Sequence, residues 1–177
     1  MTLASFTRWP AAATLDDAAA GALLGPAAWP LRSVIAPYDV ARYAPPEIGA
    51  QPATLGAAHY ELELASDTGA YQGAWGIVML VAFDAPDDVT PELERWYEQE
   101  HIDLLMRAPG WLRARRYRVR NHSGGPRWTS MAFHELADIS VMDSPERAFA
   151  RSTPWRAELE KGAWFQNAGR GVFRALA

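Results

Sequence analysis

The second half of the sequence predicts an α+β fold in which an antiparallel sheet carries two helices on one face. Three observations support this prediction: a strand-length apolar run, two alternating segments joined by a turn, and a proline-marked helix start on either side of that hairpin. The resulting order, β-α-β-β-α-β over about 100 residues, is the ferredoxin-like βαββαβ arrangement.

The first strand and helix of this arrangement have clear boundaries. Residues 76–83 form a continuous apolar run rich in branched side chains, which is typical of a buried strand. Thr90 as N-cap and Pro91 at the first helical position then predict a helix start. The helix is expected to run to about Arg107, because Pro109-Gly110 is a helix-terminating dipeptide.

A hairpin is predicted next. Two segments alternate between two faces and are joined by the turn Asn121–Pro126; they are residues 112–120 and 127–137. In the first segment Arg115 and Arg116 fall on opposite faces, and in the second His134 falls opposite Phe133. Ser144-Pro145 then opens a second helix, expected to continue through Pro154 to Trp155, and residues 171–176 supply the last strand.

The first half, residues 1–75, is less regular than the second, residues 76–177, and we treat the two as separate domains. A strand is predicted at 6–9, a helix at 16–24, further strands at 33–43 and 57–65, and a long exposed loop at 44–56. Two short stretches of sequence in the first half match stretches in the second half, which suggests a degenerate ferredoxin-like repeat. A plain N-terminal extension is the alternative. The repeat would allow a barrel to close within one chain.

Composition excludes several classes of protein. The chain has 177 residues, 49% of them hydrophobic, and no cysteine, so disulfides, thiolate-bound metals and a cysteine nucleophile are excluded. The net charge of −4 gives no basis for binding nucleic acid or an anionic membrane. The longest apolar run is too short to span a membrane, and the N-terminus does not resemble a secretory signal, so we expect a cytoplasmic protein.

The helix predicted between Thr90 and Arg107 carries the chemistry. Its apolar stripe includes Trp96 and Tyr97, and Glu100 and His101 fall inside the same stripe. Burying a carboxylate and an imidazole is costly unless each is paired, and such burial moves their pKa values. Two interpretations of His101 stay open: a core histidine bonded to a backbone carbonyl or to Glu100, and a catalytic one.

A long spaced motif runs from this helix into the following strand. It reads Trp96-Tyr97-x-x-Glu100-His101-x-x-x-Leu105-x-x-x-Pro109-Gly110-Trp111-x-x-x-Arg115-Arg116-Tyr117. This motif resembles the signature of EthD-like proteins in the dimeric α/β-barrel superfamily, over residues 76–177. The resemblance implies a ferredoxin-like unit, a homodimer, and a pocket for a small hydrophobic molecule. Members of that superfamily include cofactor-free monooxygenases, cyclases, dehydratases, isomerases, haem-dependent enzymes and proteins without an assigned activity.

The resemblance also implies roles for individual residues. Tyr97, Glu100 and His101 would form the polar lining, and Arg115 or Arg116 would hold an anion or carbonyl. His134 stands where similar proteins often have an aromatic residue, and it adds a second imidazole, either as an acid or base or as an ordinary strand residue. The walls of the pocket would be Trp96, Trp111 and Phe133.

These residues suggest an enzyme that needs no metal, nucleotide or other cofactor, since the histidines lack metal-ligand spacing and phosphate-binding loops are absent. His101, oriented by Glu100, would move a proton while Tyr97 and an arginine stabilise an oxyanion. Lyase, cyclase, isomerase and dehydratase reactions on an aromatic or polyketide-like carbonyl compound fit this set. The alternatives are a cofactor-free monooxygenase, a non-catalytic binding protein, and a purely structural Glu100–His101 pair.

Overall fold

The computed structural model describes residues 2–26, 28–69, 71 and 73–176. The chain divides into two compact units. Unit 1 contains residues within 1–66, 117–127 and 171–177, and unit 2 contains residues within 67–116 and 128–170. Strands β6 (Trp111–Ser123) and β8 (Gly169–Ala175) each begin in unit 2 and end in unit 1. The units therefore interleave along the chain, whereas the sequence alone suggested a linear boundary at residue 75.

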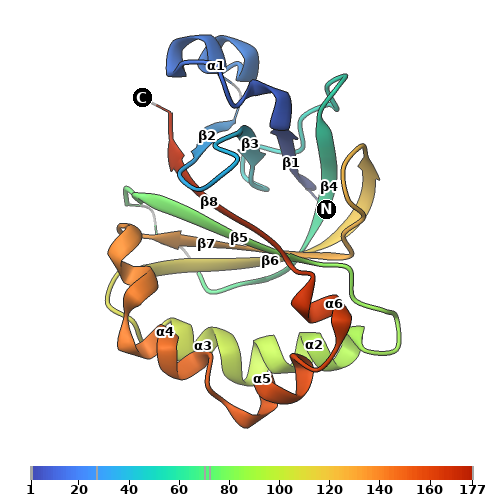
Figure 1. Cartoon of the computed structure of the whole chain (residues 1–177), viewed down its shortest axis with the longest axis vertical. Helices are drawn as coiled ribbons and strands as arrows, with labels where there is room; N and C mark the ends of the chain where they lie inside the picture. The colour runs from blue at the N-terminus through green and yellow to red at the C-terminus, as the bar shows by residue number, and fades with distance from the viewer. Residues whose placement is uncertain (1, 27, 70, 72, 177) are drawn as a thin grey trace. The chain divides into compact units, whose positions relative to one another are not determined.

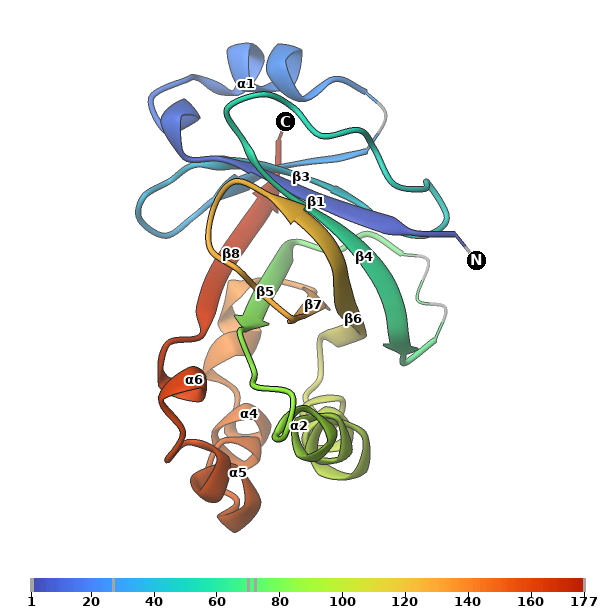
Figure 2. The same ribbon diagram turned by 90° about the vertical axis from the view of Figure 1, so that its right-hand side faces the viewer.

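Unit 1 has an antiparallel sheet with the strand order β4-β1-β3-β2. Its elements are β1 (Ala4–Trp9), the 3-10 turn η1 (Pro10–Ala12), α1 (Asp17–Leu24), β2 (Trp29–Ser33), β3 (Val40–Ala44) and β4 (Ala58–Asp67). Helix α1 contacts β2 and β3 (Figures 1 and 2). Strand β2 also pairs with the end of β8.

The first half departs from its predicted strands at residues 33–43. The strand predicted at 33–43 is wrong, because the chain turns at Tyr38, whose φ is 60°, and this separates β2 from β3. The segment 45–57 lies between β3 and β4, where a βαββαβ unit has its second helix, and it bonds to the sheet through Gln51 N–H and Ser5 Oγ, 2.9 Å apart. The degenerate repeat stays a prediction.

Unit 2 confirms the predicted order of strands and helices. Strand β5 (Ile77–Phe83) pairs antiparallel with β7 (Ser130–Leu136), and β6 follows β7 in the sheet. Its α-helices lie on one face of these strands (Figure 1): α2 (Thr90–Trp96), α3 (Ile102–Leu105), α4 (Pro145–Ala150), α5 (Pro154–Leu159) and α6 (Ala163–Gln166). A 3-10 turn, η3 (Ile139–Asp143), precedes α4.

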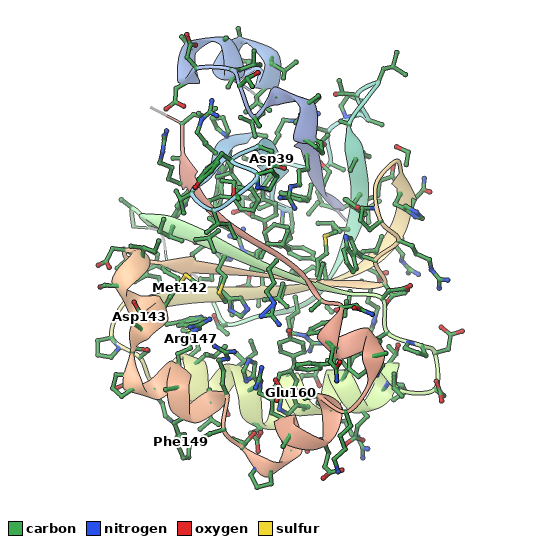
Figure 3. All side chains as sticks on the ribbon, viewed as in Figure 1. Asp39, Met142, Asp143, Arg147, Phe149 and Glu160 are labelled. Carbon is green, nitrogen blue, oxygen red and sulfur yellow. The ribbon has the colours of Figure 1, made fainter. Side chains whose placement is uncertain are left out.

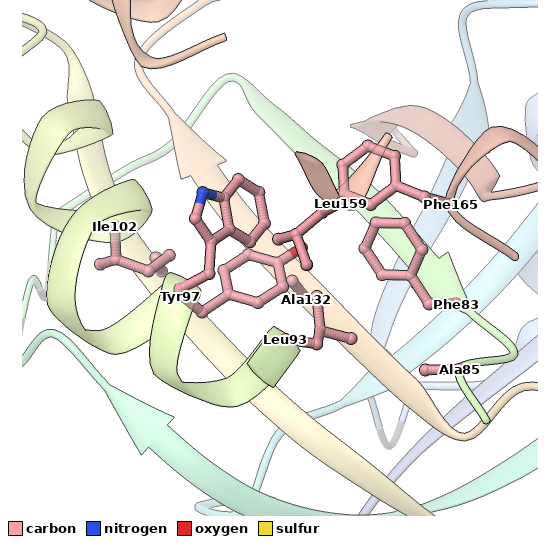
Figure 4. Close-up of a cluster of buried hydrophobic side chains, with 10 residues drawn as sticks. Phe83, Ala85, Leu93, Tyr97, Ile102, Ala132, Leu159 and Phe165 are labelled. Atoms are coloured by element: carbon pink, nitrogen blue, oxygen red, sulfur yellow. The ribbon is translucent and has the colours of Figure 1, made fainter. Parts of the chain in front are cut away.

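The core of unit 2 fixes which face of the sheet the helices cover. Phe83 and Ala132 from the strands pack against Leu93, Leu159 and Phe165 from the helices (Figure 4). Because side chains alternate along a strand, the residues two positions from these also face the helices. His134 lies two positions after Ala132, so it belongs to the helix-covered face.

The two predicted helices of unit 2 are interrupted. Val89 holds the N-cap position of α2, while the hydroxyl of Thr90 donates to the carbonyl of Pro86 at 2.9 Å, so the predicted Thr90 cap is wrong. The second helix does not continue through Pro154. It stops after Ala150 and restarts as α5, because proline cannot supply an internal helix N–H but suits a first turn.

None of the helices in the described ranges is long and apolar enough to cross a membrane.

Candidate active site

A π-helical turn, η2 (Tyr97–His101), separates α2 from α3 and was not predicted. It carries three of the predicted polar site residues. Within it the rings of Tyr97 and His101 lie 5.6 Å apart, and the indole of Trp96 stacks on the imidazole of His101 at 4.1 Å. π-Helical turns are rare and occur often at functional sites, so this interruption of the helix agrees with a site at these residues.

His101 is buried, with 9% of its surface exposed. Its Nδ1 has no hydrogen-bond partner among the described residues. The same ring also forms a hydrogen bond with the backbone of Ala150. We assign this bond to Nε2, since Nδ1 has no partner. The pKa of His101 is lowered to about 3, mainly by burial, with smaller contributions from His134, Arg156 and Arg147. The ring is therefore neutral, with an available lone pair on Nδ1.

His134 is the second buried imidazole of the site. The indole N–H of Trp111 donates to His134 Nδ1 at 3.2 Å, which leaves the proton of the neutral ring on Nε2. The pKa of His134 is lowered to about 3, mainly by burial, with smaller contributions from Arg147 and Arg116. His101 and His134 are thus both neutral, and His101 offers an acceptor at Nδ1 while His134 offers a donor at Nε2.

Glu100 does not orient His101 through a hydrogen bond, in contrast to the predicted pairing. Its Oε1 accepts from the indole N–H of Trp96 at 3.2 Å and from the hydroxyl of Thr153 at 2.6 Å. Thr153 in turn caps α5, where its Oγ1 accepts from the backbone N–H of Arg156. Glu100 therefore ties the π-helical turn to α5 and acts on His101 only through the stacked Trp96.

Tyr97 and Arg116 lie against each other. The guanidinium carbon of Arg116 is 4.4 Å from the centroid of the Tyr97 ring, within the range of a cation–π contact. Burial raises the pKa of Tyr97 to about 12, although Arg116 opposes that shift, so the phenol keeps its proton. Of the two arginines left open by the sequence, Arg116 is the one beside the aromatic and imidazole groups.

Arg115 and Phe133 lie apart from this group. Alternation along β6 and β7 turns them to the opposite face from Arg116 and His134. Arg115 is 1% exposed and forms ion pairs, each at 3.7 Å, with Glu135 and Asp67. The placement of Arg115 is explained by those ion pairs, and it does not reach Tyr97 from that face.

Sequence reasoning missed three other residues around the imidazoles. Thr153 anchors Glu100, and the charges of Arg147 and Arg156 act on His101. Thr153 before Pro154 is a recognisable N-cap signal. The arginines have no comparable signal, because only tertiary packing brings α4 and α5 beside the π-helical turn.

Neither a metal-binding cluster nor the surface groove of unit 1 lies at this group of described residues. Among the described residues no cluster of three or more His, Cys, Asp or Glu side chains could hold a metal ion. An open groove of about 620 Å³ lies in unit 1 and includes Pro10, Leu55, Ala57 and Gly125. It contains none of the predicted site residues.

Comparison with known proteins supports the fold. No family model matches the sequence, and no curated protein matches it. Solved structures do match over nearly the whole chain. A Listeria monocytogenes ferredoxin-fold protein related to antibiotic biosynthesis monooxygenases has a TM-score of 0.61 and 10% identity, covering 98% of this chain and 94% of that one.

Two further structures are similar. An anthrone oxidase-like protein has a TM-score of 0.62 and 9% identity, covering 99% of this chain and 92% of the other. A heme-degrading enzyme from Listeria monocytogenes has a TM-score of 0.57 and 12% identity, covering 97% and 98%. At such identities the likeness shows the fold alone. The chain has a ferredoxin-like α+β fold, and the more specific EthD-like resemblance stays a prediction.

Proposed function

We propose that the protein is a cofactor-independent enzyme that transfers a proton at a carbon activated by a carbonyl group. The substrate class is a hydrophobic, aromatic or polyketide-like carbonyl compound. The observation that carries the proposal is the buried Nδ1 of His101, which has no partner within the described residues and belongs to a neutral ring. Burying such a nitrogen without a hydrogen bond is costly, so a ligand atom is a natural partner.

The proposed step is a balanced proton transfer. Nδ1 of His101 takes a proton from the carbon next to the carbonyl, and the C–H electron pair becomes the carbon–carbon double bond of an enolate. The carbonyl oxygen gains the negative charge. His134 Nε2–H and the Tyr97 hydroxyl are neutral donors suited to that oxygen, and Arg116 adds a positive charge. In a β,γ-unsaturated substrate the enolate is a dienolate, and return of the proton to its γ-carbon completes an isomerisation to the α,β-unsaturated carbonyl compound.

A low pKa weakens His101 as a base, and this affects how the site would work. The pKa of about 3 applies to the site without a ligand, where burial and neighbouring cations disfavour the imidazolium. A developing enolate beside the ring would favour the imidazolium and raise that pKa. Proton transfer is therefore expected only with a substrate whose negative charge forms close to His101.

The similar structures support this substrate class without identifying a reaction. One is described as an anthrone oxidase-like protein and another as related to antibiotic biosynthesis monooxygenases. Carbanion formation is also the first step expected of the alternative proposal, a cofactor-free monooxygenase, in which the carbanion reacts with O2. A non-catalytic binding protein is the second alternative. The predicted homodimer and cytoplasmic location stay predictions.

Proton exchange tests the proposal without knowledge of the natural substrate. Anthrone and 2-tetralone are incubated with the protein in D2O, and deuterium entry at the activated methylene is followed by NMR. We expect exchange above the buffer rate, with His101→Gln reducing it at least about 100-fold, the usual contribution of a general base. His122→Gln, at an exposed position, is the matched control.

Two results would contradict the proposal. One is the absence of exchange above the buffer rate with both ketones, and the other is equal exchange by His101→Gln and the wild type. If the wild-type protein binds a ketone but does not catalyse exchange, the result would favour the binding-protein alternative.

A further inference from the structure

We propose that the ligand of the His101–His134 site carries a carboxylate in addition to its apolar body. The inference rests on the proposed function for the position of the site, but not for its catalysis. It specifies the chemical class of the ligand, which neither the predicted motif nor the similar structures provide. The argument comes from the arrangement of charge around the two imidazoles.

Positive charge reaches the site from four elements of the chain. Arg116 comes from β6, Arg147 from α4, Arg156 from α5 and Arg170 from β8, and each acts on Tyr97 or on one of the two histidines. Figure 3 shows Arg147 on the side of α4 that faces the sheet, whereas Phe149, 58% exposed, points away from it. Four cations from separate elements are unusual around residues as buried as Tyr97 and His134.

The carboxylates that balance these arginines lie at the solvent side. Glu98, 3.5 Å from Arg116, has 54% of its side chain exposed, and Glu160, 2.6 Å from Arg156, has 42% exposed. The carboxylate of Glu100 is turned to Trp96 and Thr153. The charged side chains with the largest effect on the pKa values of His101 and His134 are arginines: Arg147 and Arg156 for His101, and Arg147 and Arg116 for His134.

Arg147 is the arginine best suited to a ligand. Its Nη1 donates to the carbonyl of Met142, and this bond holds the guanidinium in place. The side chain is half-buried, so its remaining N–H groups can meet a ligand that enters from solvent. A guanidinium binds a carboxylate through two parallel hydrogen bonds, and a partly buried site strengthens them. His134 Nε2–H and the Nδ1 side of His101 would then meet the rest of the molecule.

A matched pair of ligands isolates the charge. 2-Naphthoate and 2-naphthamide have the same apolar body and differ in the anionic group, and their affinities are measured by calorimetry at pH 7. We expect the acid to bind at least tenfold more tightly than the amide, with the difference shrinking as salt is raised. Arg147→Gln should weaken the acid about tenfold and leave the amide unchanged.

Control variants distinguish a specific loss of carboxylate binding from a general loss of structure. They also test carboxylate binding independently of the proposed catalysis. Arg107→Gln removes an exposed arginine of the same unit and should change neither affinity. Should Arg147→Gln not fold, Arg147→Lys keeps the charge without the planar fork and should give an intermediate loss. Acid binding that depends on Arg147, in a protein without exchange activity, would support the inference while contradicting the proposed function.

Three results would overturn the inference. The first is equal affinity for the acid and the amide, and the second is an equal loss of 2-naphthoate affinity in Arg147→Gln and Arg107→Gln. The third is that none of benzoate, 2-naphthoate and 1-pyrenecarboxylate binds.

Discussion

Unit 1 buries His59 and unit 2 buries His101 and His134, and the difference between His59 and His101 separates a structural histidine from a candidate functional one. In unit 1, His59 is 4% exposed and its Nδ1 shares a 2.8 Å hydrogen bond with the hydroxyl of Thr7. In unit 2, Nδ1 of the similarly buried His101 has no partner in the described chain. Burial lowers the pKa of both rings. A lowered pKa therefore does not distinguish the two imidazoles, whereas the missing partner at Nδ1 of His101 does.

The arginines of the two units show the same contrast. In unit 1, Arg8 is paired with the buried Asp39, and both Arg32 and Arg174 bond to Asp17. In unit 2, Arg147 donates to a backbone carbonyl and directs its charge towards two neutral imidazoles. Arg8, Arg32 and Arg174 of unit 1 are thus paired with carboxylates, whereas Arg147 of unit 2 donates to a backbone carbonyl beside the available lone pair of His101.

The largest expected effect is on acid stability. The folded-state pKa values of His101 and His134, about 3, lie below the ordinary value of 6.5. The unfolded chain therefore binds more protons between these values, and stability falls as the pH drops through that window. At pH 4.5 the two histidines together should cost about 5 kcal/mol, an upper estimate. Urea unfolding at pH 7 and pH 4.5 measures this loss.

Variants assign that loss to unit 2. The double variant His101→Gln/His134→Gln should show a much smaller difference between the two pH values than the wild type. His122→Gln, at an exposed position, should keep the wild-type difference. A double variant as acid-sensitive as the wild type would show that these histidines are not held neutral.

The next effect concerns the neighbouring arginines of β6. Arg115→Met should destabilise the protein by about 3–5 kcal/mol, because it removes an ion-pair partner from Glu135, which is 3% exposed. Adding Glu135→Leu should recover part of the loss. Anion affinity at the His101 site should not change, since Arg115 lies on the opposite face. Denaturant unfolding and naphthoate calorimetry on the same variants check both expectations.

A smaller effect is expected at the anchor of the π-helical turn. Thr153→Val removes the cap of α5 and the hydrogen bond to Glu100, and should cost about 1–2 kcal/mol. Thr153→Ser keeps both bonds and should stay near the wild-type stability. Because Glu100 holds Trp96 against His101, Thr153→Val should also weaken naphthoate binding; unchanged binding would remove Thr153 from the site.

The smallest effect is the equivalent change in unit 1. Asp16 caps α1 by accepting from the backbone N–H of Ala19 at 2.8 Å. Asp16→Ala should cost about 1 kcal/mol. Exchange activity and naphthoate affinity should be unchanged, because unit 1 supplies none of the groups proposed for the chemistry. A loss of activity with retained folding would contradict that division between the units.

Sequence patterns predicted the strands of unit 2 better than its helices. The apolar run of β5 and the alternation of β6 and β7 have a single periodicity, so burial on one face determines them. The π-helical turn has no such signature, since its extra residue per turn is stabilised by contacts such as Glu100 with Thr153. In unit 1 the turn at Tyr38 depended on a local backbone conformation that a hydrophobic pattern does not encode.

The site was predictable as a set of residues but not as a set of contacts. The stripe position of His101 predicted a buried imidazole, and the alternation of residues 127–137 put His134 on the face opposite Phe133. The predicted bond between Glu100 and His101 was wrong, because adjacent residues on a helix point in different directions. Glu100 instead accepts a hydrogen bond from Trp96, four positions earlier on the same side of the helix. The arginines of α4 and α5 required the three-dimensional packing.

The most direct test of the account is the protonation state of His101 by ¹⁵N NMR of histidine-labelled protein, assigned with His101→Gln and His134→Gln. Both rings should be neutral at pH 6, with the proton on Nε2, and His101 Nδ1 should have the chemical shift of a nitrogen without a hydrogen bond. Addition of 2-naphthoate should shift that signal. An imidazolium at pH 6, or a proton on Nδ1 of His101, would contradict the proposal that this nitrogen is an available base.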